Sequence, residues 1–224
     1  MKLADFSRYV VLGLALAAWS APNCRASLIY NVSMNTSPLI GEAAGPFSLA
    51  FQLIDGSSAG DANNTVILSN FLFGVGGSAS GSPTVFGDAT GDLSSGITIT
   101  DSSFFNALAQ SFNPGSSLSF RFQVSTNVDA GGTPDEFSFS ILDSSGAEIP
   151  TNGFVDAFLI LDIDSSNPTP QTFSSDPSRP PQGGGGGITL DAPQAATAIP
   201  EPGTFLLLSC GICFGLFMRR KRTS

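Results

Sequence analysis

Three segments of the chain alternate between apolar and polar residues. Apolar side chains occupy every second position of residues 47–53 and 118–124, and Phe137, Phe139 and Ile141 repeat this spacing. A period of two is typical of a β-strand with one buried face and one face in water. The pattern therefore predicts a sheet that packs on a core with one side only.

Further apolar stretches are shorter or less regular. They predict additional strands at residues 27–32, 65–73, 97–100, 154–163 and 188–191. Clusters of Gly, Asn, Asp, Ser and Pro separate these candidates, as turns do. About eight short strands joined by turns indicate an all-β fold, an antiparallel β-sandwich of which a jelly roll is one form.

One segment has helical spacing instead. Its apolar residues fall at offsets of 1, 4 and 8 from the first, at Phe104, Phe105, Leu108 and Phe112. A serine at position 102 or 103 can cap the start, and Asn-Pro-Gly at 113–115 ends the run. We expect one short helix here that covers an open end of the sandwich.

Beyond Asp164 the alternation gives way to proline and glycine. Two proline-rich stretches precede five glycines at 183–187. Such residues do not continue a strand ladder. We therefore expect the sandwich to span 27–164 as one domain, followed by a linker at 165–199 whose residues 188–191 return as a last edge strand. Residues 192–199 would serve as an accessible spacer.

The beginning of the chain reads as a targeting segment. Two basic residues precede an apolar run at 9–19, and small residues follow at Cys24 and Ala26. These are the three parts of a secretory signal peptide. We expect residues 1–26 to be removed between Ala26 and Ser27. Lipidation of Cys24 is the alternative, although residues 21–23 form a poor approach to a lipidated cysteine.

The end of the chain combines an uncharged apolar run with a basic cluster. Residues 205–218 are apolar, and counting from Pro200 gives a stretch near the lower limit of about 17–25 residues for a membrane helix. Four basic residues follow it: Arg219, Arg220, Lys221 and Arg222. Such residues favour the cytoplasmic side of a membrane. We expect the preceding chain to lie outside the cytoplasm.

Pro200, Glu201 and Pro202, the apolar helix and the basic cluster together resemble the PEP-CTERM sorting signal of bacteria. The resemblance implies that an exosortase, a transpeptidase of the inner membrane, recognises residues 200–224 and removes them. The protein would then reach the cell surface or the exterior, often alongside exopolysaccharide. The alternative is a membrane anchor that is never cut.

A second resemblance covers part of the sandwich. Residues 104–106, 113–115, 118–120 and 134–139 are similar to an uncharacterised ectodomain that recurs in PEP-CTERM proteins. It implies a shared fold and supplies no activity.

The charge of the central stretch excludes several functions. Residues 27–199 hold 16 acidic residues and two basic ones, Arg121 and Arg179, which gives a formal charge of −14. Nucleic-acid binding is excluded because it relies on basic contacts to phosphate. The stretch also has no Lys, His or Cys, so it lacks the usual general base, thiolate nucleophile and zinc ligands. We predict that it is not an enzyme.

Carboxylates are the remaining candidates for chemistry. Glycoside hydrolysis needs only a pair of them, and the available residues are Asp135 with Glu136, or a pair from Asp156, Asp162 and Asp164. Near turns of an acidic exported protein, such side chains are usually solvated. Catalysis is therefore the weaker alternative.

Calcium is a second alternative, because hard cations take several oxygen ligands. Two groups gather such oxygens: Asp55 and Asp61 with Asn63 and Asn64, and Asp162 and Asp164 with Asn167. Neither matches a calcium-loop consensus. A stacking platform for sugars is not expected, because Tyr30 is the only Trp or Tyr in residues 27–199.

Together these patterns predict an exported, non-enzymatic protein of the cell surface or extracellular matrix. A calcium-dependent ligand-binding module and a carboxylate-based glycoside hydrolase are the alternatives. No cofactor other than calcium is expected.

Overall fold

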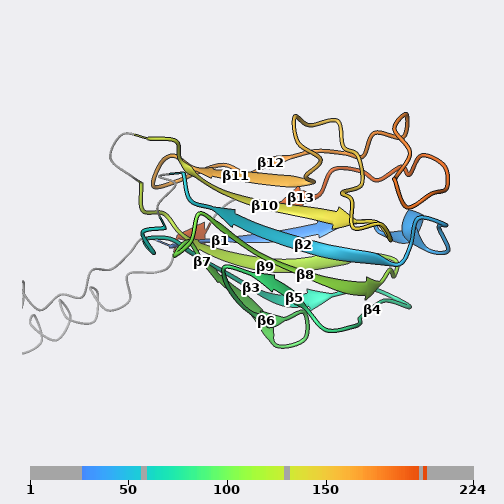
Figure 1. Cartoon of the computed structure of the whole chain (residues 1–224), viewed down its shortest axis with the longest axis horizontal. Coiled ribbons are helices and arrows are strands. Elements are labelled where there is room, and N and C mark those ends of the chain that lie inside the picture. Colours follow the sequence, from blue (N-terminus) through green and yellow to red (C-terminus); the bar gives the residue numbers. More distant parts are fainter. Residues whose placement is uncertain (1–26, 57–59, 129–131, 197–198, 201–224) are drawn as a thin grey trace, which may run out of the picture.

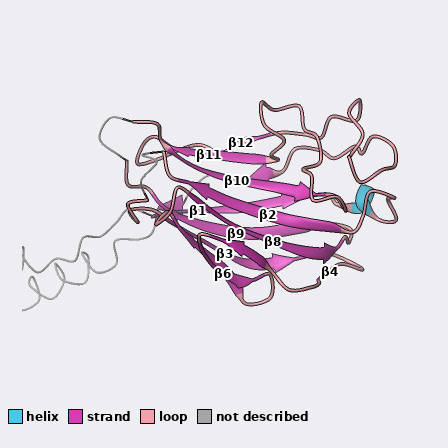
Figure 2. Cartoon of the chain, viewed as in Figure 1, coloured by secondary structure: helices cyan, strands magenta, loops and turns pink. Residues whose placement is uncertain are grey.

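The computed structural model describes residues 27–56, 60–128, 132–196 and 199–200. Two seven-stranded antiparallel sheets pack face to face (Figures 1 and 2). The prediction of an all-β antiparallel sandwich is confirmed. In the part of the chain that is described, the only helical element is a short 3₁₀ turn at Ser37–Leu39.

Sheet A and sheet B are defined by their strand orders. Sheet A runs β13 (Gln194–Ala195), β1 (Ser27–Met34), β9 (Leu118–Ser125), β3 (Thr65–Leu72), β7 (Gly96–Thr100) and β6 (Asp88–Asp92), and β14 (Ile199–Pro200) also pairs with β1. Sheet B runs β12 (Gln171–Thr172), β11 (Leu159–Ile163), β10 (Asp135–Leu142), β2 (Phe47–Ile54), β8 (Phe105–Asn113) and β4 (Ser78–Ala79), and β5 (Thr84–Phe86) also pairs with β8.

Aromatic residues from both sheets meet between the layers. Phe51 of β2 contacts Phe120 of β9 edge to face, with ring centroids 5.4 Å apart, and stacks on Phe139 of β10 at 5.3 Å. The ring centroid of Phe122 in β9 lies 4.7 Å from that of Tyr30 and 5.0 Å from that of Phe137. Apart from Tyr30 of β1, these rings occupy apolar positions of the three alternating segments, so the predicted alternation sets which face of each of those strands is buried.

The prediction of a short helix at 104–112 is wrong. Residues 105–113 form β8, which pairs with β2 along its length from Phe47↔Phe112 to Ile54↔Phe105. The period of two was hidden because two positions of the inward face carry polar side chains, Asn106 and Gln110, both buried. Without them, the remaining apolar residues fall at helical intervals.

Asn106 and Gln110 are satisfied by bonds that join the two sheets. Asn106 Oδ1 accepts a hydrogen bond from the Asp88 amide at 2.9 Å, at the start of β6. Gln110 Oε1 accepts one from the Leu93 amide at 2.8 Å, directly after β6. Buried polar groups are tolerated when they are paired in this way. The tertiary structure therefore overrides the local helical spacing.

The expected linker at 165–199 is part of the fold instead. Ile188 and Leu190 are buried in the core. They do not form the edge strand expected at 188–191, because their backbone groups bond to the Ser175 hydroxyl, which donates to Ile188 O at 2.7 Å and accepts from Leu190 N at 2.6 Å. The last strands are β13 and β14, both on β1, so the expected spacer at 192–199 contributes to sheet A.

The glycine run allows a close backbone approach. A Cβ at Gly187 would lie 1.8 Å from Pro177 O, which no side chain can adopt without displacing the backbone. Gly184 and Gly185 have φ angles of 102° and 88°, which favour glycine. The glycine-rich composition, which is typical of a flexible linker, here allows a folded turn.

The strand predicted at 154–163 is shorter than expected. β11 begins only at Leu159, while Phe154 and Val155 are exposed. Residues 157–161 are all buried, as their continuous apolar character predicts.

The interlocked rings lead to a prediction about stability. Phe51→Ala should lower the free energy of unfolding by about 3–5 kcal/mol, because it removes a fully buried ring and its cross-sheet contacts. Phe104→Ala is the matched control, since that side chain is 54% exposed and should cost well under about 1 kcal/mol. Urea unfolding measures both, and equal losses would contradict this account of the core.

Candidate functional site

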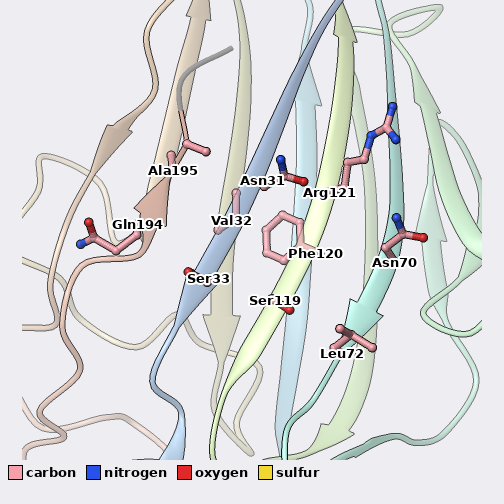
Figure 3. A pocket seen from close by; sticks show the side chains of 11 residues that line it. Asn31, Val32, Ser33, Asn70, Leu72, Ser119, Phe120, Arg121, Gln194 and Ala195 are labelled. Carbon is pink, nitrogen blue, oxygen red and sulfur yellow. The ribbon is translucent and has the colours of Figure 1, made fainter. Parts of the chain in front are cut away.

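A groove of about 490 Å³ crosses the outer face of sheet A over β13, β1, β9 and β3 (Figure 3). Its volume lies within the usual range of small-ligand sites, about 300–1,000 Å³. Six polar side chains line it: Asn31, Ser33, Asn70, Ser119, Arg121 and Gln194.

Strand register brings these residues together. Asn31 of β1 lies opposite Arg121 of β9, and Arg121 lies opposite Ser69 of β3. Directly paired residues of neighbouring strands project from the same face. Because Phe120 and Phe122 of β9 point into the core, Arg121 between them projects to the outside.

A bulge in β3 shapes one side of the groove. The pairing of β3 with β9 shifts between Ser69 and Leu72, so that one extra residue is inserted. Asn70 lies in this bulge with φ at 57°, a left-handed conformation that asparagine tolerates better than most residues. Figure 3 shows Asn70 and Leu72 on β3, next to Arg121 and Ser119 on β9.

The other side of the groove comes from the end of the chain. Gln194 of β13 lies opposite Ser33 of β1, and the Ala196 amide donates a hydrogen bond to Asn31 O at 2.9 Å. Residues far apart in sequence thus form one surface. Sequence spacing alone gives no signal for it.

Arg121 is the only charged residue on the four strands under the groove. β13, β1, β9 and β3 contain no acidic residue. Both ion pairs among the described residues are made by Arg179, with Asp156 at 2.7 Å and Asp176 at 3.1 Å. Arg121 makes neither an ion pair nor a side-chain hydrogen bond there. Its guanidinium donors are open to solvent or to a ligand.

The residues of the predicted sorting signal lie mostly outside the described residues. Ala26, Glu201, Pro202 and the basic cluster at 219–222 are not described. Ser27 begins β1 and Pro200 ends β14. No helical element between residues 27 and 200, as far as these are described, has the length and apolar character that a membrane span needs.

The calcium candidates fall in two places, one at Asp55 and Asp61 and the other at Asp162 and Asp164 on and after β11. Asp55 is buried, and its Oδ2 accepts hydrogen bonds from the amides of Gly60 at 2.8 Å and Asp61 at 3.1 Å. Asp61 is exposed and bonds to Asn63. Asp162 lies on the outer face of sheet B opposite Glu136, and Asp164 follows β11 in an exposed position.

Asp55 lies close to two other buried carboxyl groups, Asp101 and Asp135, and no sequence pattern predicts that these two meet. The Gly56 amide, next to Asp55, donates to Asp135 Oδ1 at 2.8 Å. Asn64 Nδ2 donates to Asp135 Oδ2 at 2.7 Å, while the Asn64 amide donates to both oxygens of Asp101, at 3.1 and 2.9 Å. N–H groups therefore occupy these carboxylate oxygens.

The pKa of Asp101 reflects this environment. Burial, and then a hydrogen bond with the Asp135 carboxyl and the charge of Asp135, raise the pKa of Asp101 to about 7, although the hydrogen bond from the Asn64 amide lowers it. Asp101 therefore holds a proton below about pH 7 and can donate it to Asp135. Among the described residues, no three His, Cys, Asp or Glu side chains are grouped so as to hold a metal ion. Calcium binding therefore stays a prediction without an assembled site.

The candidate catalytic carboxylates do not face each other across a cleft. Asp135 is buried on the inner face of β10, and Glu136, its neighbour in sequence, is on the outer face. Glu136 and Asp162 are side by side on adjacent strands; burial and then the Asp162 charge raise the pKa of Glu136. Asp156 is paired with Arg179.

No family model, curated protein or solved structure matches the chain. The site is therefore interpreted from its own geometry.

The carboxyl pair predicts an unusual dependence of stability on pH. Folding raises the pKa of Asp101 from its ordinary value of 3.8 to about 7, so between these values the folded state binds a proton that the unfolded chain does not. Protonation of Asp101 therefore favours the folded state at low pH, and this stabilisation is lost as pH rises from about 4 to about 7. Asp101→Asn keeps an acceptor for Asn64 and a donor for Asp135. It should stabilise the fold at pH 8 by about 1–3 kcal/mol and change it little at pH 4.5.

Urea unfolding at the two pH values measures the effect. Asp92→Asn is the control: backbone and side-chain hydrogen bonds from Ser95 and Ser94 lower the pKa of this exposed carboxylate, so its substitution should not stabilise the fold at pH 8. Equal stability of Asp101→Asn and the unsubstituted protein at pH 8 would contradict the raised pKa of Asp101.

Proposed function

We propose that this is an exported, non-enzymatic protein of the cell surface or extracellular matrix, sorted by an exosortase through its C-terminal PEP-CTERM signal. The observation that carries the proposal is the sequence of the tail, in which Pro200, Glu201 and Pro202 are followed by an apolar stretch and four basic residues. An uncut anchor has no need of the Pro-Glu-Pro triplet. On this proposal, residues 1–26 are the signal peptide and 200–224 the sorting segment.

The geometry of sheet A supports the proposal. Pro200 of β14 is paired with Leu28 of β1, one residue after the proposed cleavage site between Ala26 and Ser27. Both ends of the sandwich therefore lie side by side on one edge of sheet A (Figure 1). A precursor held in the inner membrane by its tail would extend its opposite end, and both sheet faces, away from that membrane.

The absence of a catalytic role rests on side-chain chemistry. Residues 27–199 contain no Lys, His or Cys. Of their candidate carboxylates, Asp135 is buried with an amide partner, Asp156 is paired with Arg179, Glu136 and Asp162 are adjacent on one sheet, and Asp164 is exposed. A glycosidase needs two carboxyl groups on either side of a bound sugar. This distribution supports a structural or binding role in the envelope or matrix.

We also propose that the sandwich is a jelly roll. β1 pairs with β9, β2 with β8 and β3 with β7, and successive pairs lie in sheet A, sheet B and sheet A. Nested pairing of this kind is what a two-stranded ribbon produces when it wraps around a core.

The sorting proposal predicts the outcome of a single substitution. In the native host, the unsubstituted protein should be recovered outside the membrane as a species from Ser27 to near Pro200. Glu201→Ala should remain in the membrane fraction with residues 219–222 attached, because the recognition triplet is lost. Intact mass of the protein in membrane and medium fractions measures this.

The chain offers a matched control in a second Pro-x-Pro triplet, Pro168-Thr169-Pro170. Thr169 is exposed, and Thr169→Ala should be processed normally. If the unsubstituted protein keeps its basic tail in the membrane, it is an anchored surface protein and the sorting proposal is wrong.

A further inference from the structure

We propose that the groove on sheet A binds a carboxylated, hydroxyl-rich oligosaccharide, of the uronate class, with Arg121 holding the carboxylate. This inference goes beyond the sorting proposal, and its test does not depend on processing of the tail. It rests on the Arg121 guanidinium, which has no ion-pair or hydrogen-bond partner among the described residues, on the acid-free strands around it, and on the amide and hydroxyl side chains that share the groove.

The charge at this groove favours an anionic ligand. The sandwich carries many carboxylates and should repel an anionic polymer over most of its surface. The four strands under the groove carry none, and Arg121 lies on the central one of them. Its partner positions in the neighbouring strands are Asn31 and Ser69, both neutral. An anionic ligand in this groove thus meets one positive charge and no carboxylate on the strands beneath it.

The Arg121 side chain is suited to a carboxylate. Planar guanidinium groups bind carboxylates through two parallel hydrogen bonds, which adds specificity to charge. Arg179, the other basic residue of the described chain, already has this role inside the protein, with Asp156 and Asp176 as partners. Arg121 has no such partner among the described residues, although the domain is rich in carboxylates. The fold leaves its donors to an external group.

The other polar side chains that line the groove are suited to sugar hydroxyls. Asn31, Asn70 and Gln194 supply amides, and Ser33 and Ser119 supply hydroxyls. Within the described residues, none of these five side chains makes a hydrogen bond. Amides and hydroxyls both donate and accept, as sugar hydroxyls do. Three large apolar residues also line the groove; Val32 and Phe120 are buried, whereas Leu72 is 65% exposed and can contact a sugar ring.

The shape of the groove depends on the irregularity in β3. The bulge in β3 turns Asn70 toward the groove at the cost of a left-handed backbone, a kind of irregularity that is frequent at binding sites. Figure 3 shows β13 on one side and β3 on the other, with Asn31 and Arg121 between them. A short oligosaccharide can lie across β1 and β9 with its carboxylate at Arg121.

Calorimetric titration of the full-length protein in a zwitterionic, sugar-free detergent tests the proposal. The probes are trigalacturonate and its fully methyl-esterified form, which keeps the hydroxyls and lacks the charge. Trigalacturonate should bind at least about tenfold more tightly than the ester. Arg121→Gln should lower its affinity to that of the ester, and Arg121→Lys, which keeps the charge and loses the fork, should lie between.

Arg179→Gln is the matched control, because it removes the same charge away from the groove. It should leave the affinity for trigalacturonate unchanged, whatever it does to the melting temperature. The proposal is overturned if trigalacturonate does not bind, if the ester binds equally well, or if both arginine substitutions weaken binding to the same extent. Equal affinity for triglutamate would also overturn it, because the groove would then select a carboxylate without the sugar.

Discussion

Aromatic side chains that interlock between the two sheets hold this fold together, and the positions of the other groups follow from them. Phe51 from sheet B packs against Phe120 from sheet A, and Phe122 lies between Tyr30 and Phe137. Residues 27–199 have no cysteine, so burial of apolar surface replaces covalent cross-links. Register is fixed because a slip of one residue would turn every ring of a strand toward water. The same constraint directs Arg121 to the outside.

β1 connects the features that bear on function. Its partner on one side is β9, which carries Arg121. Its partners on the other side are β13 and β14, and β14 ends at Pro200. One strand thus joins the floor of the groove, the first residue of the proposed mature protein and the first residue of the proposed sorting motif. This arrangement keeps the proposed ligand-binding face on a rigid sheet.

Sequence patterns predicted the fold class and most long strands, because the inward faces of β2, β9 and β10 are almost uniformly apolar. They failed at β8, where Asn106 and Gln110 face inward and are satisfied by amides near β6. They also failed at 165–199, where buried Ile188 and Leu190 are held by Ser175 in a proline- and glycine-rich stretch. The groove could not be predicted, because strand order brings together residues 31, 70, 121 and 194; only the outward direction of Arg121 followed from alternation.

The most direct test of the account is arginine modification by phenylglyoxal on the protein in its native extracellular fraction, read by mass spectrometry. Arg179, engaged by two aspartates, is the internal reference. The account predicts that the protein is found outside the membrane, with Arg121 protected in that fraction and reactive once the protein is purified. Equal reactivity of Arg121 in both samples would contradict a groove occupied by an extracellular ligand.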